Sequence, residues 1–241
     1  MQRFTEEGTR DITIENLGDY SDGVLAALAA RPALSPLAPP WEEHLAKCDA
    51  HEAKKKAARR VLNRARVGYL FVDAEFDGVV KATSGETYHL AGKDELAEPY
   101  ASFFGVVKAQ DIIAFGEAKA TAYGRNMVKK EAEILGALTS ESAKGSVKGL
   151  IEGMRDATAH LEEAGDLRED AATALQALDI ERRKLIRETL TLIGLTEVGI
   201  LTQYPRRRDL VDAVLALSSQ STKKKPQEEV APDTSAVELP A

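Results

Sequence analysis

The sequence is short of the residues on which several common protein classes depend. It has one cysteine in 241 residues, and aromatic residues make up only 5% of the chain. A lone cysteine, Cys48, excludes a disulfide within the chain. Few aromatic residues and abundant alanine disfavour a β-sandwich or β-barrel, whose strands are rich in aromatic and β-branched side chains. The composition therefore favours an all-α fold.

The sequence also lacks the signals of membrane insertion and export. It contains no run of about 18 apolar residues, and no charged segment followed by an apolar leader begins it. We therefore expect no membrane span and a cytoplasmic location. The formal net charge of -7 disfavours wholesale binding to nucleic acid or to an anionic membrane.

Common catalytic motifs are missing as well. The sequence has no G-x-x-x-x-G-K-[ST] loop, no G-x-S-x-G elbow and no G-x-G-x-x-G after a strand. His51-Glu52 begins like the H-E-x-x-H of zinc peptidases, but Lys55 stands where the second histidine is needed. A di-iron bundle needs two E-x-x-H motifs, and only Glu86 to His89 fits, in an expected turn. The sequence thus predicts a protein that is not an enzyme and needs no cofactor.

What the sequence does have is a long heptad seam. Steps of three and four residues connect one set of positions, most of them apolar, without a break: Trp41, His44, Cys48, His51, Lys55, Ala58, Leu62, Ala65, Tyr69, Val72, Phe76 and Val79. A helix of this length is not stable alone in water, because most helical stability comes from packing an apolar face. We therefore expect other segments to cover the seam.

The rest of the chain supplies such segments. Helical periodicity predicts long helices at 41–82, 94–138 and 147–195, packed as an elongated antiparallel bundle. Gly165 leaves two topologies open, because a glycine followed by a capping box could reverse the chain and give four helices. The register is almost kept across Gly165, which favours one continuous helix. Three glycines in the interior of 94–138, Gly105, Gly116 and Gly124, indicate close approach of a neighbouring helix.

The bundle is expected to have distinct ends. Residues 1–40 read as an N-terminal arm, a short helix after Ser21 and a proline-rich linker. The bundle itself is expected over 41–217. Residues 218–241 are rich in Ser, Lys, Glu and Pro and lack periodicity, which predicts a disordered tail.

The sharpest polar cluster is His44, Cys48 and His51. These residues share one helix face, and each can bind zinc or another borderline metal such as iron. One helix rarely supplies three ligands in tetrahedral geometry, and the fourth ligand would have to come from elsewhere. A polar layer whose imidazoles reach water is therefore the favoured interpretation, with metal binding as the alternative.

Charged segments suggest how helices pair and where partners bind. The basic run 54–66 lacks interleaved aromatics for base stacking, so we expect it to pair with the acidic segment 162–181 and not with nucleic acid. Arg206, Arg207 and Arg208 are candidates for contact with an acidic partner. Val237 and Leu239, in a small apolar patch of the tail, are candidates for docking on a larger assembly.

Two function classes remain. The first is a non-enzymatic helical scaffold that associates with itself, as a homo-oligomer, or with a protein assembly through its termini. The second is a metal-binding protein or enzyme that uses the His44, Cys48 and His51 layer. The predicted long seams leave little concavity for a small-molecule pocket, which favours the first class.

Overall fold

The computed structural model describes residues 13–216, which contain helices and no strand, so the all-α fold is confirmed. Val237, Leu239, the tail 218–241 and the first part of the N-terminal arm lie outside the described residues. The chain divides into two compact units. Unit 1 comprises Met1–Glu52 and Glu181–Ala241, and unit 2 comprises Ala53–Ile180.

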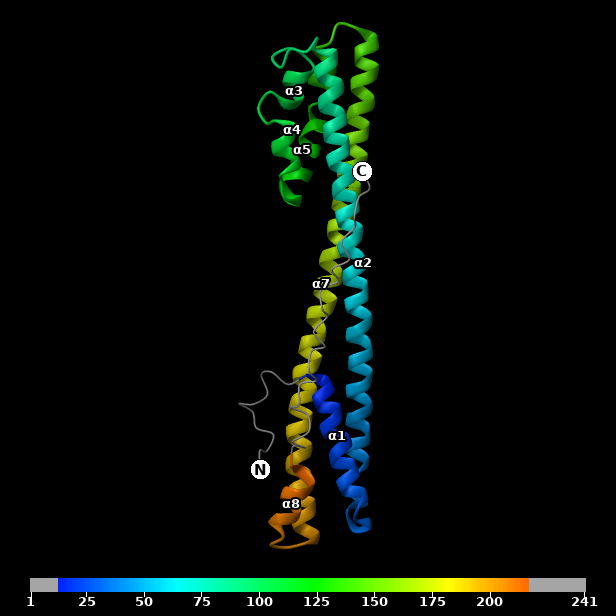
Figure 1. Ribbon diagram of the computed structural model, residues 1–241, viewed down its shortest axis with the longest axis vertical. Coiled ribbons are helices and arrows are strands. Elements are labelled where there is room, and N and C mark those ends of the chain that lie inside the picture. Colours follow the sequence, from blue (N-terminus) through cyan, green and yellow to red (C-terminus); the bar gives the residue numbers. More distant parts are fainter. Residues whose placement is uncertain (1–12, 217–241) are drawn as a thin grey trace, which may run out of the picture. The chain divides into compact units, whose positions relative to one another are not determined.

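Two long helices, α2 (Pro39–Leu90) and α7 (Glu141–Gln203), contribute to both units. Within each unit they pack against each other in antiparallel directions (Figure 1). The seam of α2 is confirmed, because Trp41, Leu62, Tyr69 and Phe76 are buried. The continuous third helix is also confirmed, since α7 passes through Gly165 without reversing.

The first long helix extends beyond its expected end near residue 82. Thr83 and Thr87 are fully buried in α2, and the Thr87 hydroxyl donates a hydrogen bond to the Thr83 carbonyl at 2.7 Å. The chain turns only at Gly92 and Lys93, whose φ angles are 66° and 68°. Bonding to the preceding helical turn satisfies the Thr87 hydroxyl, so this buried polar residue is accommodated within the helix.

Unit 1 is completed by three elements around α2 and α7. These are α1 (Ile14–Ala29), the 3₁₀ helix η2 (Pro32–Leu37) and α8 (Arg208–Leu215). Helix α1 begins earlier than expected, because the Thr13 side chain caps it by accepting from the Asn16 amide. The core of the unit gathers apolar side chains from all five elements, among them Leu28, Leu34, Trp41, Ile200 and Val211.

Unit 2 shows that the expectation of one helix over 94–138 is wrong. Four short helices occupy this stretch: α3 (Tyr100–Phe104), α4 (Ala109–Ile113), α5 (Glu117–Lys129) and α6 (Glu131–Gly136). Their apolar residues pack with α2 and α7 in one core that includes Phe76, Phe104, Ile112, Met127, Ile134, Met154 and Leu161.

Proline and glycine explain the breaks. Pro99 is the N-cap of α3, where its missing amide hydrogen is tolerated, and Gly105 is the C-cap of the same helix. Gly116 is the N-cap of α5. Two of the three glycines taken as helix-interior residues thus lie at helix ends, and a helical period across them does not require a continuous helix.

The third glycine, Gly124, confirms the expected close approach. A Cβ atom at this position in α5 would lie 3.0 Å from Thr158 Cβ and would overlap the Thr158 hydroxyl oxygen of α7. At Gly165 a Cβ atom would meet only the carboxylate at the end of the flexible Glu117 side chain. Gly124 is therefore the glycine that brings α5 onto α7.

No helix within residues 13–216 is both long enough and apolar enough to cross a membrane.

Substituting Gly124 tests the contact between α5 and α7. Gly124→Ala should lower the free energy of unfolding by about 1–3 kcal/mol, because Thr158 is held by a 2.6 Å hydrogen bond to the Met154 carbonyl and cannot move aside freely. Gly149→Ala is the matched control, because no atom lies within 4 Å of a Cβ there. It should be neutral or stabilise by up to about 1 kcal/mol. Equal effects of the two changes in urea unfolding would contradict this packing.

Candidate functional site

The predicted His44, Cys48 and His51 cluster lies in unit 1 and is buried. The expectation that the imidazoles reach water is wrong, because His44 is 1% exposed and His51 is 3% exposed. The seam carries a buried polar layer at this level, since other segments of unit 1 cover it. The His44 ring lies edge-on to Trp41, with ring centroids 6.3 Å apart. Trp41 in turn donates its indole N–H to the Thr196 hydroxyl of α7 at 2.8 Å.

Both ring nitrogens of His44 have a polar neighbour on α7. His44 Nε2 forms a 2.8 Å hydrogen bond with the Thr189 hydroxyl, and the same hydroxyl lies 3.0 Å from the Leu185 carbonyl. Glu188 approaches Nδ1 at 3.6 Å. The imidazole is therefore held between two residues of α7.

Burial controls the titration of this layer. It lowers the pKa of His44, while the nearby carboxylate of Glu188 acts in the opposite direction and Lys47 adds to the lowering. Burial also raises the pKa of the Cys48 thiol to about 11, with Asp49 and Glu188 adding to the effect. Cys48 is therefore a thiol and not a thiolate at neutral pH, which makes it a poor nucleophile and metal ligand.

The metal hypothesis finds no assembled ligand set. Cys48 Sγ lies 3.7 Å from His44 Nε2, but that nitrogen is already engaged in a hydrogen bond with Thr189. Among residues 13–216, no group of three or more His, Cys, Asp or Glu side chains is arranged to hold a metal ion. The layer is instead a set of polar contacts between α2 and α7.

The predicted arginine triplet lies at the start of α8. Arg206, Arg207 and Arg208 are all exposed, and Arg206 adopts a φ of 70°. Arg207 makes a two-pronged ion pair with Asp209, with distances of 2.9 and 2.7 Å from its Nε and terminal nitrogen. Arg206 and Arg208 present their charge to solvent, whereas Arg207 is largely engaged within the turn.

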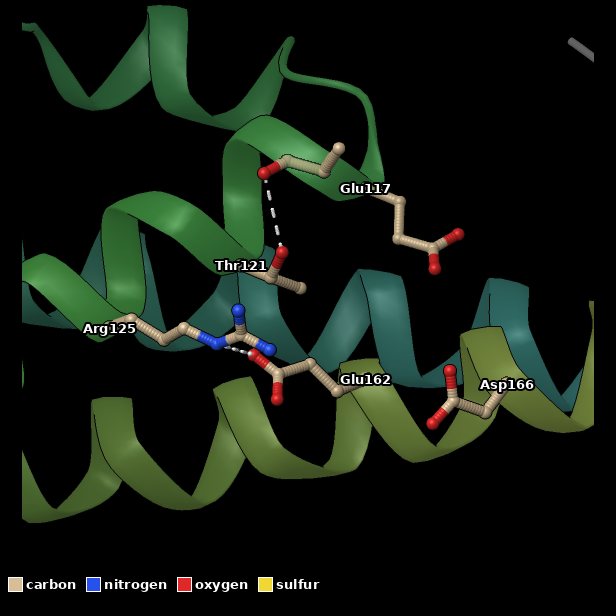
Figure 2. A pocket seen from close by; sticks show the side chains of 6 residues that line it. Glu117, Thr121, Arg125, Glu162 and Asp166 are labelled. Carbon is tan, nitrogen blue, oxygen red and sulfur yellow. Dashed lines mark hydrogen bonds and ion pairs between the residues drawn. The ribbon is translucent and has the colours of Figure 1, made fainter.

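Unit 2 holds a polar pocket of 400 Å³ between α5 and α7 (Figure 2). Arg125 of α5 reaches Glu162 of α7 at 2.6 Å, and Figure 2 shows this pair in the centre of the pocket. Glu117 pairs with Arg168 at 2.6 Å. Each of these glutamates has an arginine partner, and the two ion pairs connect α5 to α7. The glutamates therefore do not form an assembled cation site.

A second hollow in unit 2 has a different character. It is an apolar groove of 520 Å³ lined only by α2 and α7: Val61, Arg64, Ala65, Gly68, Tyr69 and Val72 from α2, and His160, Glu163, Ala164 and Leu167 from α7. Val61 is 55% exposed and Leu167 is 58% exposed. Large apolar side chains thus face solvent on both walls of this surface, called the α2/α7 groove below.

Charged side chains flank the groove. Arg64 stands on its α2 wall and Glu163 on its α7 wall, and neither has an ion-pair partner within the described part of the chain. On the floor, the Arg168 guanidinium lies 4.2 Å from the centre of the Tyr69 ring, a cation–π contact that fixes the tyrosine. Parts of the basic run 54–66 and of the acidic segment 162–181 therefore line one surface, as expected, while their direct pairing stays a prediction.

The groove was not expected from the sequence. Its seam positions were expected to be covered, and the signal that could have found it is the pair of large apolar residues that fall off the seam on its two walls, Val61 and Leu167. Both side chains are more than half exposed, at 55% and 58%.

Comparison with known proteins finds no matching family model, no matching curated protein and no matching solved structure.

The pH dependence of unfolding tests the His44 layer. Because the pKa of His44 in the folded chain lies below the ordinary value of 6.5, the unfolded chain binds more protons as the pH falls through that value. The contribution of neutral, buried His44 to the free energy of unfolding is therefore present above pH 6.5 and is lost on acidification. His44→Gln should flatten this dependence in urea unfolding between about pH 5 and 8, whereas His89→Gln, at an exposed position, should preserve it. An unchanged slope in His44→Gln would contradict this assignment.

Proposed function

We propose that this chain is a non-enzymatic structural protein that acts by binding protein, either a further copy of itself or a larger assembly. The observation that carries the proposal is the α2/α7 groove with its exposed apolar walls. Contiguous apolar surface of this kind is costly in water and is typical of sites where another protein binds.

The chemistry of the groove favours a protein partner over a small substrate. Apart from the Tyr69 hydroxyl, its polar side chains are Arg64, His160 and Glu163, which are exposed, and all other lining side chains are apolar. A catalytic pocket usually has several polar groups that converge on one point. An amphipathic helix, in contrast, needs an apolar groove with charged edges.

The most strongly perturbed groups support the absence of catalysis. Cys48 is 1% exposed, and burial raises its pKa. Burial likewise raises the pKa of Tyr123, whose hydroxyl donates to the Phe103 carbonyl at 2.9 Å. Perturbed groups that act in catalysis face a cleft, whereas these two belong to helix packing.

The polar layer of unit 1 fits a structural role. The pairs Trp41 with Thr196 and His44 with Thr189 join α2 to α7 at defined levels. A buried polar pair of this kind penalises other registers, because sliding the helices would leave its donors unsatisfied. The layer therefore fits a scaffold in which α2 and α7 keep one register. The free Cys48 fits a reducing compartment, and the proposal places the protein in the cytoplasm.

Photo-crosslinking at the groove tests the proposal. A photo-reactive amino acid at Leu167 should form one discrete protein adduct in cells that express the full chain, because a bound partner would cover that position. The adduct should disappear when Val61→Glu is added. The same probe at Leu195, which is 62% exposed on α7 in unit 1, is the control for exposure alone. Equal adducts at both positions, or none at Leu167, would argue against a protein-binding groove.

Deletion of residues 218–241 tests the contribution of the tail. If Val237 and Leu239 help to dock the chain, the deletion should weaken association while the thermal midpoint stays nearly unchanged, because the described core ends at Leu215. Association is measured as the yield of the Leu167 adduct. An undiminished yield would assign the contact to the groove and remove the tail from the proposal.

A further inference from the structure

We infer that the occupant of the α2/α7 groove is a second copy of this chain, placed by a two-fold axis that runs along the groove. This inference rests on the proposed function and names its partner. It is carried by the arrangement of charge on the two walls of the groove.

The two walls of the groove carry opposite charge at one level. Arg64 is the exposed basic side chain on the α2 wall, and Glu163 is the exposed acidic side chain on the α7 wall. Neither has an ion-pair partner within residues 13–216. One basic and one acidic side chain therefore flank the same apolar groove.

Such a surface is complementary to itself. A two-fold interface brings one surface patch against an identical patch, so a patch of a single charge would repel its copy. A two-fold axis along the groove lays α2 of each copy on α7 of the other and leaves the level along the helices unchanged. Arg64 and Glu163, which line the groove at the same level, then each face the opposite charge across the interface.

The alternative two-fold arrangement is electrostatically unfavourable. An axis across the groove at right angles to the helices would lay α2 on α2 and α7 on α7. Arg64 would then lie near Arg64 of the second copy and Glu163 near its Glu163, and like charges brought together at an interface are costly. The charge pattern thus selects the axis along the groove.

The apolar floor has room for a second pair of helices. A Cβ at Gly68 would meet no atom within 4 Å, so the α2 backbone is open to close approach at the centre of the groove. Ala65 and Ala164 are small neighbours on the two walls, and Val61 and Leu167 project beside them. Two such surfaces would form a four-helix layer that buries the exposed apolar side chains of both copies.

The test is sedimentation equilibrium of the full chain, with charge-reversal variants. The parent chain should show a monomer–dimer equilibrium. Arg64→Glu and Glu163→Arg should each raise the dissociation constant about tenfold or more, because each places like charges across the interface twice. Both positions are exposed, so the fold is expected to persist, as circular dichroism can verify.

Mixing the two variants tests whether opposite charges at these two positions support the dimer that each single variant weakens. A chain with Arg64→Glu has glutamate at both positions and a chain with Glu163→Arg has arginine at both, so a mixed dimer restores two opposite-charge pairs. We expect the 1:1 mixture, and also the double variant, to dimerise within about threefold of the parent. Leu167→Glu should abolish the dimer, while Leu195→Glu should leave it intact.

The outcomes distinguish the inference from the proposed function. A parent chain that stays monomeric at every concentration, or a mixture that does not recover the dimer, overturns the two-fold arrangement. If a monomeric chain still gives a discrete Leu167 adduct with another protein, the groove binds a different partner and the proposed function stands. If neither a dimer nor an adduct forms, both proposals fail.

Discussion

The structure depends on one constraint, which is that two helices in contact can bury only a narrow stripe of each. A heptad seam covers the facing positions of α2 and α7 and leaves the sides of both helices in water. Each unit needs additional elements to build a deeper core. Unit 1 obtains it from α1, η2 and α8, and unit 2 from the four short helices α3 to α6. Where α2 and α7 alone line the surface, the α2/α7 groove remains.

Much of this architecture could be predicted, because seam periodicity is a local property of the sequence. Trp41, Cys48, Leu62 and Phe76 are buried as the spacing predicts, and α7 continues through Gly165 because the register on either side agrees. The prediction of one helix over 94–138 was wrong for a related reason. Short helices that pack on the same neighbour keep an apolar period, and Gly105 and Gly116 could be read either as interior residues or as caps until the structure placed them at helix ends.

For the candidate sites too, local spacing could be predicted from the sequence and tertiary contacts could not. Spacing alone placed His44, Cys48 and His51 on one face, but the expectation that the imidazoles reach water was wrong, because both are buried. Their partner could not be predicted, because Thr189 is 145 residues away from His44 and has no spacing relationship to it. The groove was missed because exposure of Val61 or Leu167 depends on which elements fail to cover them. That is a property of the tertiary structure and not of any one helix.

The single cysteine makes local opening of unit 1 measurable. Cys48 is enclosed by Ile14, Leu17, Leu185 and Ile186, so a reagent reaches its sulfur only when α1 or the end of α7 lifts away from α2. Modification of this thiol in the folded chain therefore reports local opening around Cys48. The rate of modification at equilibrium measures the free energy of that local opening, and it does so in the natural sequence, without any added label.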